Sequence, residues 1–183
     1  MKPNLSLTTL TTLTTLLACS LAQAHVTLDQ PQASAGSAYK AVLRVGHGCS
    51  AGAATHTVSV RLPAGLRGFK PVPKAGWAIT IRRQPLDTPH DNHGVSVTDE
   101  VAEITWQART RDDWLADAHC GEFVLRGQLP AQPGPLWFKV QRACEGSSVD
   151  WAELPGTGTN TKGLKIPAAL SEVLPATAAA HQH

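Results

Sequence analysis

A histidine directly follows a triplet of small residues near the start of the chain, in the segment "LAQAHVTLDQPQ" of residues 21–32. Ala22-Gln23-Ala24 is the type of site at which signal peptidases cut, so cleavage would make His25 the first residue of the exported protein. Its α-amino group and imidazole would then form one chelate, because both nitrogens can lose a proton near neutral pH. Such donors, with an oxygen partner in a tetragonal arrangement, suit Cu(II) or Ni(II), and Cu(II) heads the affinity order of the divalent metals. The alternative is that His25 is only the residue that cleavage happens to leave first.

The residues before His25 have the features of a secretory signal. Residues 1–24 contain one early cation, Lys2, followed by an uncharged run rich in leucine and threonine. We therefore predict a soluble protein in the periplasm or secreted, after cleavage between Ala24 and His25. A second possibility is a lipoprotein, because Leu-Leu-Ala-Cys ending at Cys19 resembles the motif at which bacterial lipoproteins are cut and acylated. That cut would leave His25 inside the chain.

Composition excludes several classes of partner and of metal site. The 183 residues carry 16 Lys and Arg against 14 Asp and Glu, a formal net charge of +2, which provides no basic field for nucleic acid. The one methionine, Met1, lies in the predicted signal. The mature chain therefore lacks the thioether ligands typical of Cu(I) transport and of blue-copper centres, so oxidised copper is favoured.

The mature chain keeps three cysteines, Cys49, Cys120 and Cys144. In an oxidising compartment one disulfide and one remaining thiol are the simplest arrangement. Three pairings are possible, and we favour Cys49 with Cys144 because they flank strand-like segments. Cys120 would then be buried and inert, or accessible to a metal.

Apolar and polar residues alternate in seven short segments separated by turns rich in Gly, Pro, Asn and Asp. This pattern predicts an all-β fold, an immunoglobulin-like antiparallel β-sandwich of about seven or more short strands. We expect the domain to span residues 25–155 and residues 156–183 to form a poorly ordered tail. The predicted strands are 38–45, 56–62, 77–83, 103–108, 122–129, 136–142 and 148–154.

Five segments together resemble the YcnI-like family of secreted or periplasmic bacterial copper-binding proteins. They are "AHVTLDQPQASAGSAYKAVLRVGHGC", "PKAGWAI", "HDNHG", "HCGEFVLRG" and "DWAELP". The resemblance implies one Cu(II) per chain, bound by the amine and imidazole of the first histidine, with a carboxylate and a nearby tryptophan. Matched motif by motif, these residues are His25, Glu122 and Trp151. Without the resemblance, Glu122 would be an ordinary exposed strand charge and Trp151 a core residue.

Two functions from different classes remain. The first is a non-enzymatic protein of copper homeostasis or trafficking that exchanges copper with another periplasmic or membrane copper-handling protein, since no hydrolase or phosphate-binding motif is present. The second is a copper monooxygenase with an N-terminal histidine brace, for which His90, His93 or His119 would have to supply the second imidazole. His181 and His183 could bind stray copper weakly. The oligomeric state is not predicted.

Overall fold

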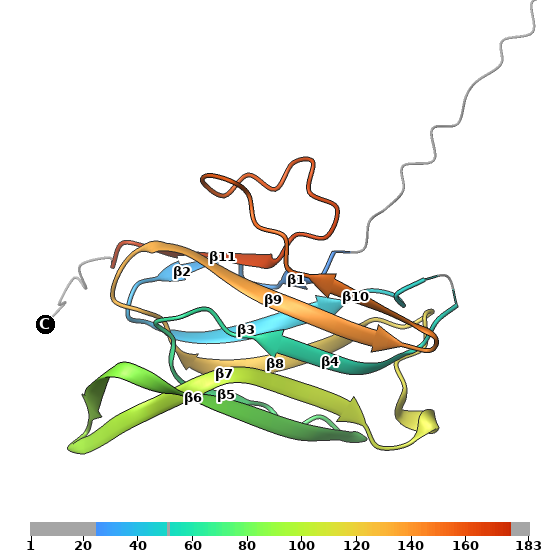
Figure 1. Ribbon diagram of the computed structural model, residues 1–183, viewed down its shortest axis with the longest axis horizontal. Helices are drawn as coiled ribbons and strands as arrows, with labels where there is room; N and C mark the ends of the chain where they lie inside the picture. Colours follow the sequence, from blue (N-terminus) through green and yellow to red (C-terminus); the bar gives the residue numbers. More distant parts are fainter. Residues whose placement is uncertain (1–24, 51, 177–183) are drawn as a thin grey trace, which may run out of the picture.

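The computed structural model describes residues 25–50 and 52–176, in which two β-sheets pack face to face (Figure 1). The predicted signal peptide, residues 1–24 with Cys19 and the cleavage site, lies outside the described residues, as do His181 and His183. In the described ranges no helix is long and apolar enough to cross a membrane.

The smaller sheet has four strands in the order β1-β3-β8-β5, and each neighbouring pair is antiparallel. Its longest pairing joins all eight residues of β3 to β8, with Ala38 opposite Gln128 and Val45 opposite Gly121. The strands are β1 (Thr27–Leu28), β3 (Ala38–Val45), β5 (Arg67–Pro71) and β8 (Gly121–Gln128).

The larger sheet follows the order β2-β11-β9-β4-β7-β6, with β10 paired to β9 beside this path. The β2–β11 pair is parallel and the others are antiparallel. The prediction of an all-β sandwich is therefore confirmed. The strands are β2 (Gln32–Ser34), β4 (Thr55–Arg61), β6 (Trp77–Asn92), β7 (Val95–Ala108), β9 (Gly134–Cys144), β10 (Ser147–Trp151) and β11 (Ala169–Leu174).

Side chains that alternate along the strands fill the space between the two sheets. In β9, every second residue from Leu136 to Cys144 is buried, while the residues between them face outward. Trp106 of β7 meets Phe123 of β8 edge-on, with ring centroids 5.6 Å apart, and so joins the two sheets. Aromatic contacts of this geometry add to the burial of apolar area and fix how the sheets face each other.

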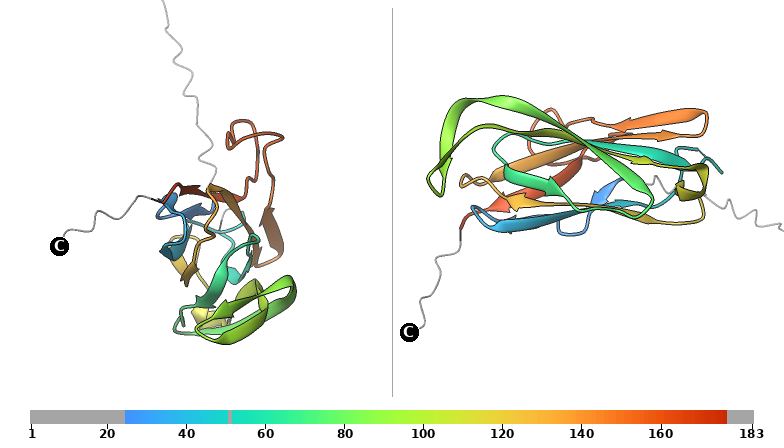
Figure 2. Two further views of the ribbon diagram at one scale, coloured as in Figure 1. Left: turned by 90° about the vertical axis from the view of Figure 1, so that its left-hand side faces the viewer. Right: turned by 90° about the horizontal axis from the view of Figure 1, so that it is seen from below.

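Residues 84–102, the longest connection between predicted strands, form a β-hairpin instead of a loop. Residues 84–92, which we expected to form a loop, continue β6 and pair with β7 (Figure 2). Pro85 is tolerated because β6 is an edge strand and the register shifts on either side of this residue. The hairpin turns at His93 and Gly94, whose φ angles are 54° and 81°. β5 was also missed, because Gly68 and Pro71 made its sequence look like a turn.

The domain extends beyond residue 155, where the sequence predicted its end. β11 inserts between β2 and β9, pairing Ala169 with Phe138 and Val173 with both Gly134 and Ala33. Its inward residues are buried because they complete the core at this edge. The prediction of a poorly ordered tail is thus wrong for residues 156–176, and residues 177–183 lie outside the described part of the chain.

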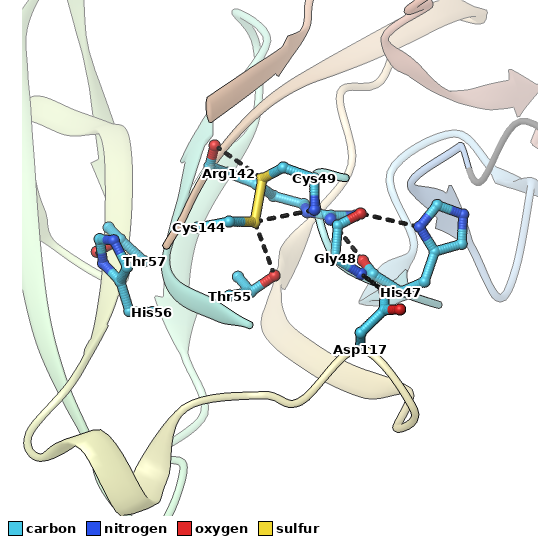
Figure 3. Close-up of a disulfide and its surroundings, with 9 residues drawn as sticks. All are labelled: His47, Gly48, Cys49, Thr55, His56, Thr57, Asp117, Arg142 and Cys144. Atoms are coloured by element: carbon cyan, nitrogen blue, oxygen red, sulfur yellow. Dashed lines mark hydrogen bonds between the residues drawn. A yellow bond between two sulfur atoms is a disulfide. The ribbon is translucent and has the colours of Figure 1, made fainter. Parts of the chain in front are cut away.

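A disulfide joins Cys49 to Cys144, as favoured from the sequence (Figure 3). It ties the loop after β3 to the end of β9. Cys144 is buried, and its sulfur accepts a hydrogen bond from the backbone N–H of Cys49 at 3.0 Å and contacts the hydroxyl of Thr55 at 3.3 Å. Cys120 is a free thiol and is exposed, so the first of the two alternatives given for it, a buried and inert cysteine, is wrong.

Candidate metal centre

His25 lies two residues before β1 and is half-buried. The next residue, Val26, is 2% exposed and belongs to the core between the sheets. Because side chains alternate along extended chain, His25 and the exposed Thr27 belong to the outer side of the smaller sheet. β1 forms an edge of that sheet, so the histidine stands at the margin of the sandwich.

A hollow of about 320 Å³ lies beside His25. One wall comes from the histidine and β1, and the other from Thr159, Thr161 and residues 167–170. The first residue of the described chain therefore faces a space large enough for a hydrated ion and its exchangeable ligands.

The loop that carries Thr159 and Thr161 joins β10 to β11 and rises above the sandwich (Figure 1). Its neck is closed by Glu153, whose carboxylate accepts the backbone N–H groups of Lys165 at 2.8 Å and of Ile166 at 3.2 Å. Backbone hydrogen bonds from Glu153 to Ile166 and from Ala168 to Glu153 close the same neck. This network holds the wall of the hollow in place.

Glu122 lies on β8, where its side chain is exposed. It pairs across the strands with Arg44, and Arg44 pairs with Thr27, so these three residues form one row over the smaller sheet. The outer side that carries His25 therefore also carries Glu122. Within the row, β3 separates Thr27 from Glu122 by two strand spacings, about 10 Å between backbones, and His25 lies two residues farther along the chain from Thr27. Arg44 forms an ion pair with Asp29, and within the described residues no ion pair involves Glu122.

Trp151 ends β10 and is 6% exposed. It stands opposite Val140 and packs with it into the core from the larger sheet. The guanidinium of Arg142 lies over the indole, 4.8 Å from the ring centroid. Because the indole points inward while Glu122 faces outward from the other sheet, the structure does not bring the three predicted residues into one cluster. In the described ranges no group of three or more His, Cys, Asp or Glu side chains is arranged to hold a metal ion.

Arg142 is the residue of this region that the sequence analysis missed. Its side chain is fully buried and reaches under the backbone of residues 47–49, where one amino group donates to the carbonyl of His47 (Figure 3). Burial lowers the pKa of the guanidinium to about 10, although the carboxylate of Asp117 opposes this shift. Strand alternation could have found it, because Arg142 continues the inward series Leu136, Phe138 and Val140.

Asp117 organises the loop next to this arginine. Its two carboxylate oxygens accept the backbone N–H groups of Gly48 at 2.7 Å and of Gly52 at 3.1 Å. These hydrogen bonds hold the pKa of the Asp117 carboxyl below its ordinary value. The disulfide, the arginine and the aspartate thus fix one loop at the end of the sandwich.

Among the other histidines, His90 and His56 have side-chain contacts within the fold. His90 lies 3.2 Å from the carboxylate of Glu100, whose two oxygens also accept the backbone N–H of Gly68. His93 occupies the hairpin turn. His56 packs on Trp114 with ring centroids 5.0 Å apart.

A family model described as a domain of unknown function, DUF1775, matches residues 25–173. The matched region includes β11, in agreement with the extended domain, and begins at His25. No curated protein gave a significant match.

Among solved structures, an uncharacterized protein from Nocardia farcinica, described as having an immunoglobulin-like fold, is similar with a TM-score of 0.62 and 23% identity. The alignment covers 84% of this chain and 99% of that one. The likeness confirms the immunoglobulin-like architecture predicted from the strand pattern.

Two cohesin structures also match, but their TM-scores are too low to indicate the same fold. One is a type I cohesin–dockerin complex from Clostridium thermocellum, with a TM-score of 0.38, 10% identity, and coverage of 82% of this chain and 98% of that one. The other is a ScaB type I cohesin from Pseudobacteroides cellulosolvens, with a TM-score of 0.38, 13% identity, and coverage of 87% and 96%.

Proposed function

The chain belongs to the DUF1775 family, and on that premise we propose that it is a Cu(II)-binding protein of the YcnI-like type. It acts in the periplasm or outside the cell, in copper homeostasis or trafficking, and holds one Cu(II) per chain. The observation that carries the proposal is the position of His25. This residue directly follows the predicted Ala-Gln-Ala cleavage site, and the family domain begins at the same residue.

The donors around His25 suit Cu(II). The histidine itself would supply the amine and the imidazole, and it lines a solvent-connected hollow at the margin of the sandwich. Glu122 is proposed as the carboxylate, because it shares the outer side of the same sheet and is outside the ion pairs of the described residues. A carboxylate is a hard oxygen donor that offsets the charge of a cation held by neutral nitrogens. Bound copper would provide a Lewis-acidic cupric centre at the first residue.

Trp151 is proposed as the aromatic group near the metal, and its surroundings set a condition on that role. Arg142 already lies over the indole, and a second cation against the same face would meet electrostatic repulsion. Any approach of the copper to Trp151 must therefore be from the opposite face or the ring edge. Trp151→Phe tests this role, since quenching of fluorescence by Cu(II) should decrease. Unaltered quenching would place Trp151 outside the site.

The decisive experiment separates the amine from the imidazole. Three proteins are compared by competition with a Cu(II) chelator: the mature chain beginning at His25, the same chain with one extra alanine before it, and His25→Ala. We expect the two altered chains to lose affinity to a similar extent, because each lacks one arm of the chelate. All three should lack residues 177–183, so that the terminal histidines do not contribute. His93→Asn, at the hairpin turn, is the matched control and should bind as the mature chain does.

Two results would contradict the proposal. The first is an alanine-extended chain that binds Cu(II) as tightly as the mature chain, which would exclude the amine. The second is an electron paramagnetic resonance spectrum of the copper-loaded protein without nitrogen hyperfine couplings. Affinity should also fall as the pH drops through about 6, where protons compete for both nitrogens.

The monooxygenase alternative is tested with the same copper-loaded protein. Incubation with ascorbate and oxygen should release no more hydrogen peroxide than the His25→Ala chain releases. Peroxide production that depends on His25, or oxidation of an added polysaccharide, would instead favour the enzyme.

A further inference from the structure

A buried cluster of hydrogen-bond donors lies in the core beside the disulfide, apart from the proposed copper site. The guanidinium of Arg142 is 0% exposed, and its Nε and Nη1 groups have no acceptor among the described residues. The indole Nε1–H of Trp151 is also buried without an acceptor there. Both residues come from adjacent strands, β9 and β10, and the guanidinium lies over the indole ring.

All of these groups are donors, and the guanidinium also carries a positive charge. Guanidinium and indole N–H groups cannot accept hydrogen bonds, so they cannot satisfy each other. A buried donor without an acceptor destabilises the fold, and an uncompensated buried charge destabilises it more. The N–H groups of Arg142 and Trp151 therefore require a hydrogen-bond acceptor, and a negatively charged acceptor would also neutralise the guanidinium.

Asp117 does not serve as this acceptor. Its carboxylate interacts with Arg142 through space, but its oxygens accept the N–H groups of Gly48 and Gly52. It forms no ion pair with Arg142 within 4.0 Å in the described part of the chain. The π face of Trp151 lies against the guanidinium and compensates part of its charge, but it is not a conventional acceptor for the Arg142 N–H groups.

We propose that Arg142 and Trp151 form an internal binding site for one small monovalent anion of the halide class. A halide accepts hydrogen bonds from several donors without directional preference and donates none. It therefore matches a site made only of N–H groups and one cation. The inference goes beyond the copper proposal and does not depend on it.

Trp106 provides a built-in comparison. Its Nε1 is also buried without an acceptor in the described residues, but its ring packs on Phe123, and the cation–π contacts of this part of the chain do not include it. An indole N–H without an adjacent charge should recruit an anion much less strongly. The two tryptophans therefore separate a true anion site from general solvation of buried donors.

The test is crystallographic and uses bromide as the probe. Crystals of the mature protein soaked in sodium bromide should show one anomalous peak per chain in hydrogen-bonding contact with Arg142 and Trp151, and none at Trp106. Density at the Arg142 site without an anomalous signal would identify an ordered water and overturn the proposal. Absence of any density there would overturn it as well.

A second experiment measures N–H resonances by nuclear magnetic resonance in solution, so it also applies to core variants that do not crystallise. The indole N–H resonance of Trp151 should shift saturably with sodium bromide, but not with sodium gluconate at equal ionic strength. Arg142→Gln keeps a donor for the carbonyl of His47 and removes the charge, so it should abolish the saturable bromide shift of the Trp151 indole resonance. Trp151→Phe keeps the charge and the packing, and the bromide dissociation constant, followed through the Arg142 Nε–H resonance, should rise about tenfold. Trp106→Phe should leave that constant unchanged. An equal rise in Trp106→Phe, or no change in Trp151→Phe, would refute the site.

Discussion

Removing the disulfide between Cys49 and Cys144 gives the most quantitative test of the fold. The two cysteines are 95 residues apart in sequence, so in the unfolded chain the bridge closes a long loop. The chain-entropy relation gives a stabilisation of about 4.7 kcal/mol at 25 °C for a loop of this size. This is a large share of the roughly 5 to 15 kcal/mol by which most domains are stable.

The change is the double substitution Cys49→Ala with Cys144→Ala. We expect the free energy of unfolding to fall by about 4 kcal/mol, because the unfolded chain regains its loop entropy and the buried sulfur of Cys144 loses its contact with Thr55. The measurement is urea unfolding of the mature protein without reductant, followed by tryptophan fluorescence. Cys120→Ala is the matched control, since its thiol is exposed and outside the bridge, and should change stability by less than about 0.5 kcal/mol.

A double variant within about 1 kcal/mol of the parent would refute the reasoning, provided that mass spectrometry shows the bridge in the parent. Such a result would mean that the unfolded chain is already restrained without the disulfide.

Three further changes test the loop, the core and the domain boundary. Asp117→Asn should flatten the loss of stability below about pH 4, because a carboxyl whose pKa is lowered stabilises the fold above its ordinary range and loses this contribution on acidification; urea midpoints between pH 3 and 7 measure it. Gly127→Ala should cost about 1 to 3 kcal/mol in urea unfolding, since its Cβ would lie 2.1 Å from the ring of buried Phe69, and an unchanged midpoint would contradict this packing. Removal of residues 156–183 should abolish the cooperative unfolding transition seen by circular dichroism, whereas removal of 177–183 should preserve it.

Alternation of side chains made most of the fold predictable. The segment "AYKAVLRV" was predicted as a strand over residues 38–45, which are the bounds of β3. Two of the failures, β11 and the far half of β6, have a common cause, because these segments are held by their partners rather than by their own sequence. β11 has only six residues among alanines and prolines, and its pairing with β2 and β9 cannot be read from local pattern.

The candidate site was less predictable than the fold. The position of His25 at the margin of a sheet follows from the chain order, and the outward side chain of Glu122 follows from alternation. Trp151 points inward, which agrees with the prediction of a core tryptophan that its strand pattern gives without the family resemblance. Arg142 could not be expected in the core on residue type, because arginine is rarely buried, although its place in the alternation of β9 indicates it.

The parallel pairing of β2 with β11 has a consequence for how the molecule assembles. Gln32 and Glu172, which share a hydrogen bond at 3.0 Å, are separated by 140 positions, so this edge closes only when the last strand has arrived. Topologies dominated by such distant pairings fold slowly, because the entropy of bringing far-apart segments together is lost before any contact compensates for it. A chain delivered amino end first would therefore remain open along one side throughout its delivery, and would be vulnerable to proteases and aggregation until its final segment is released.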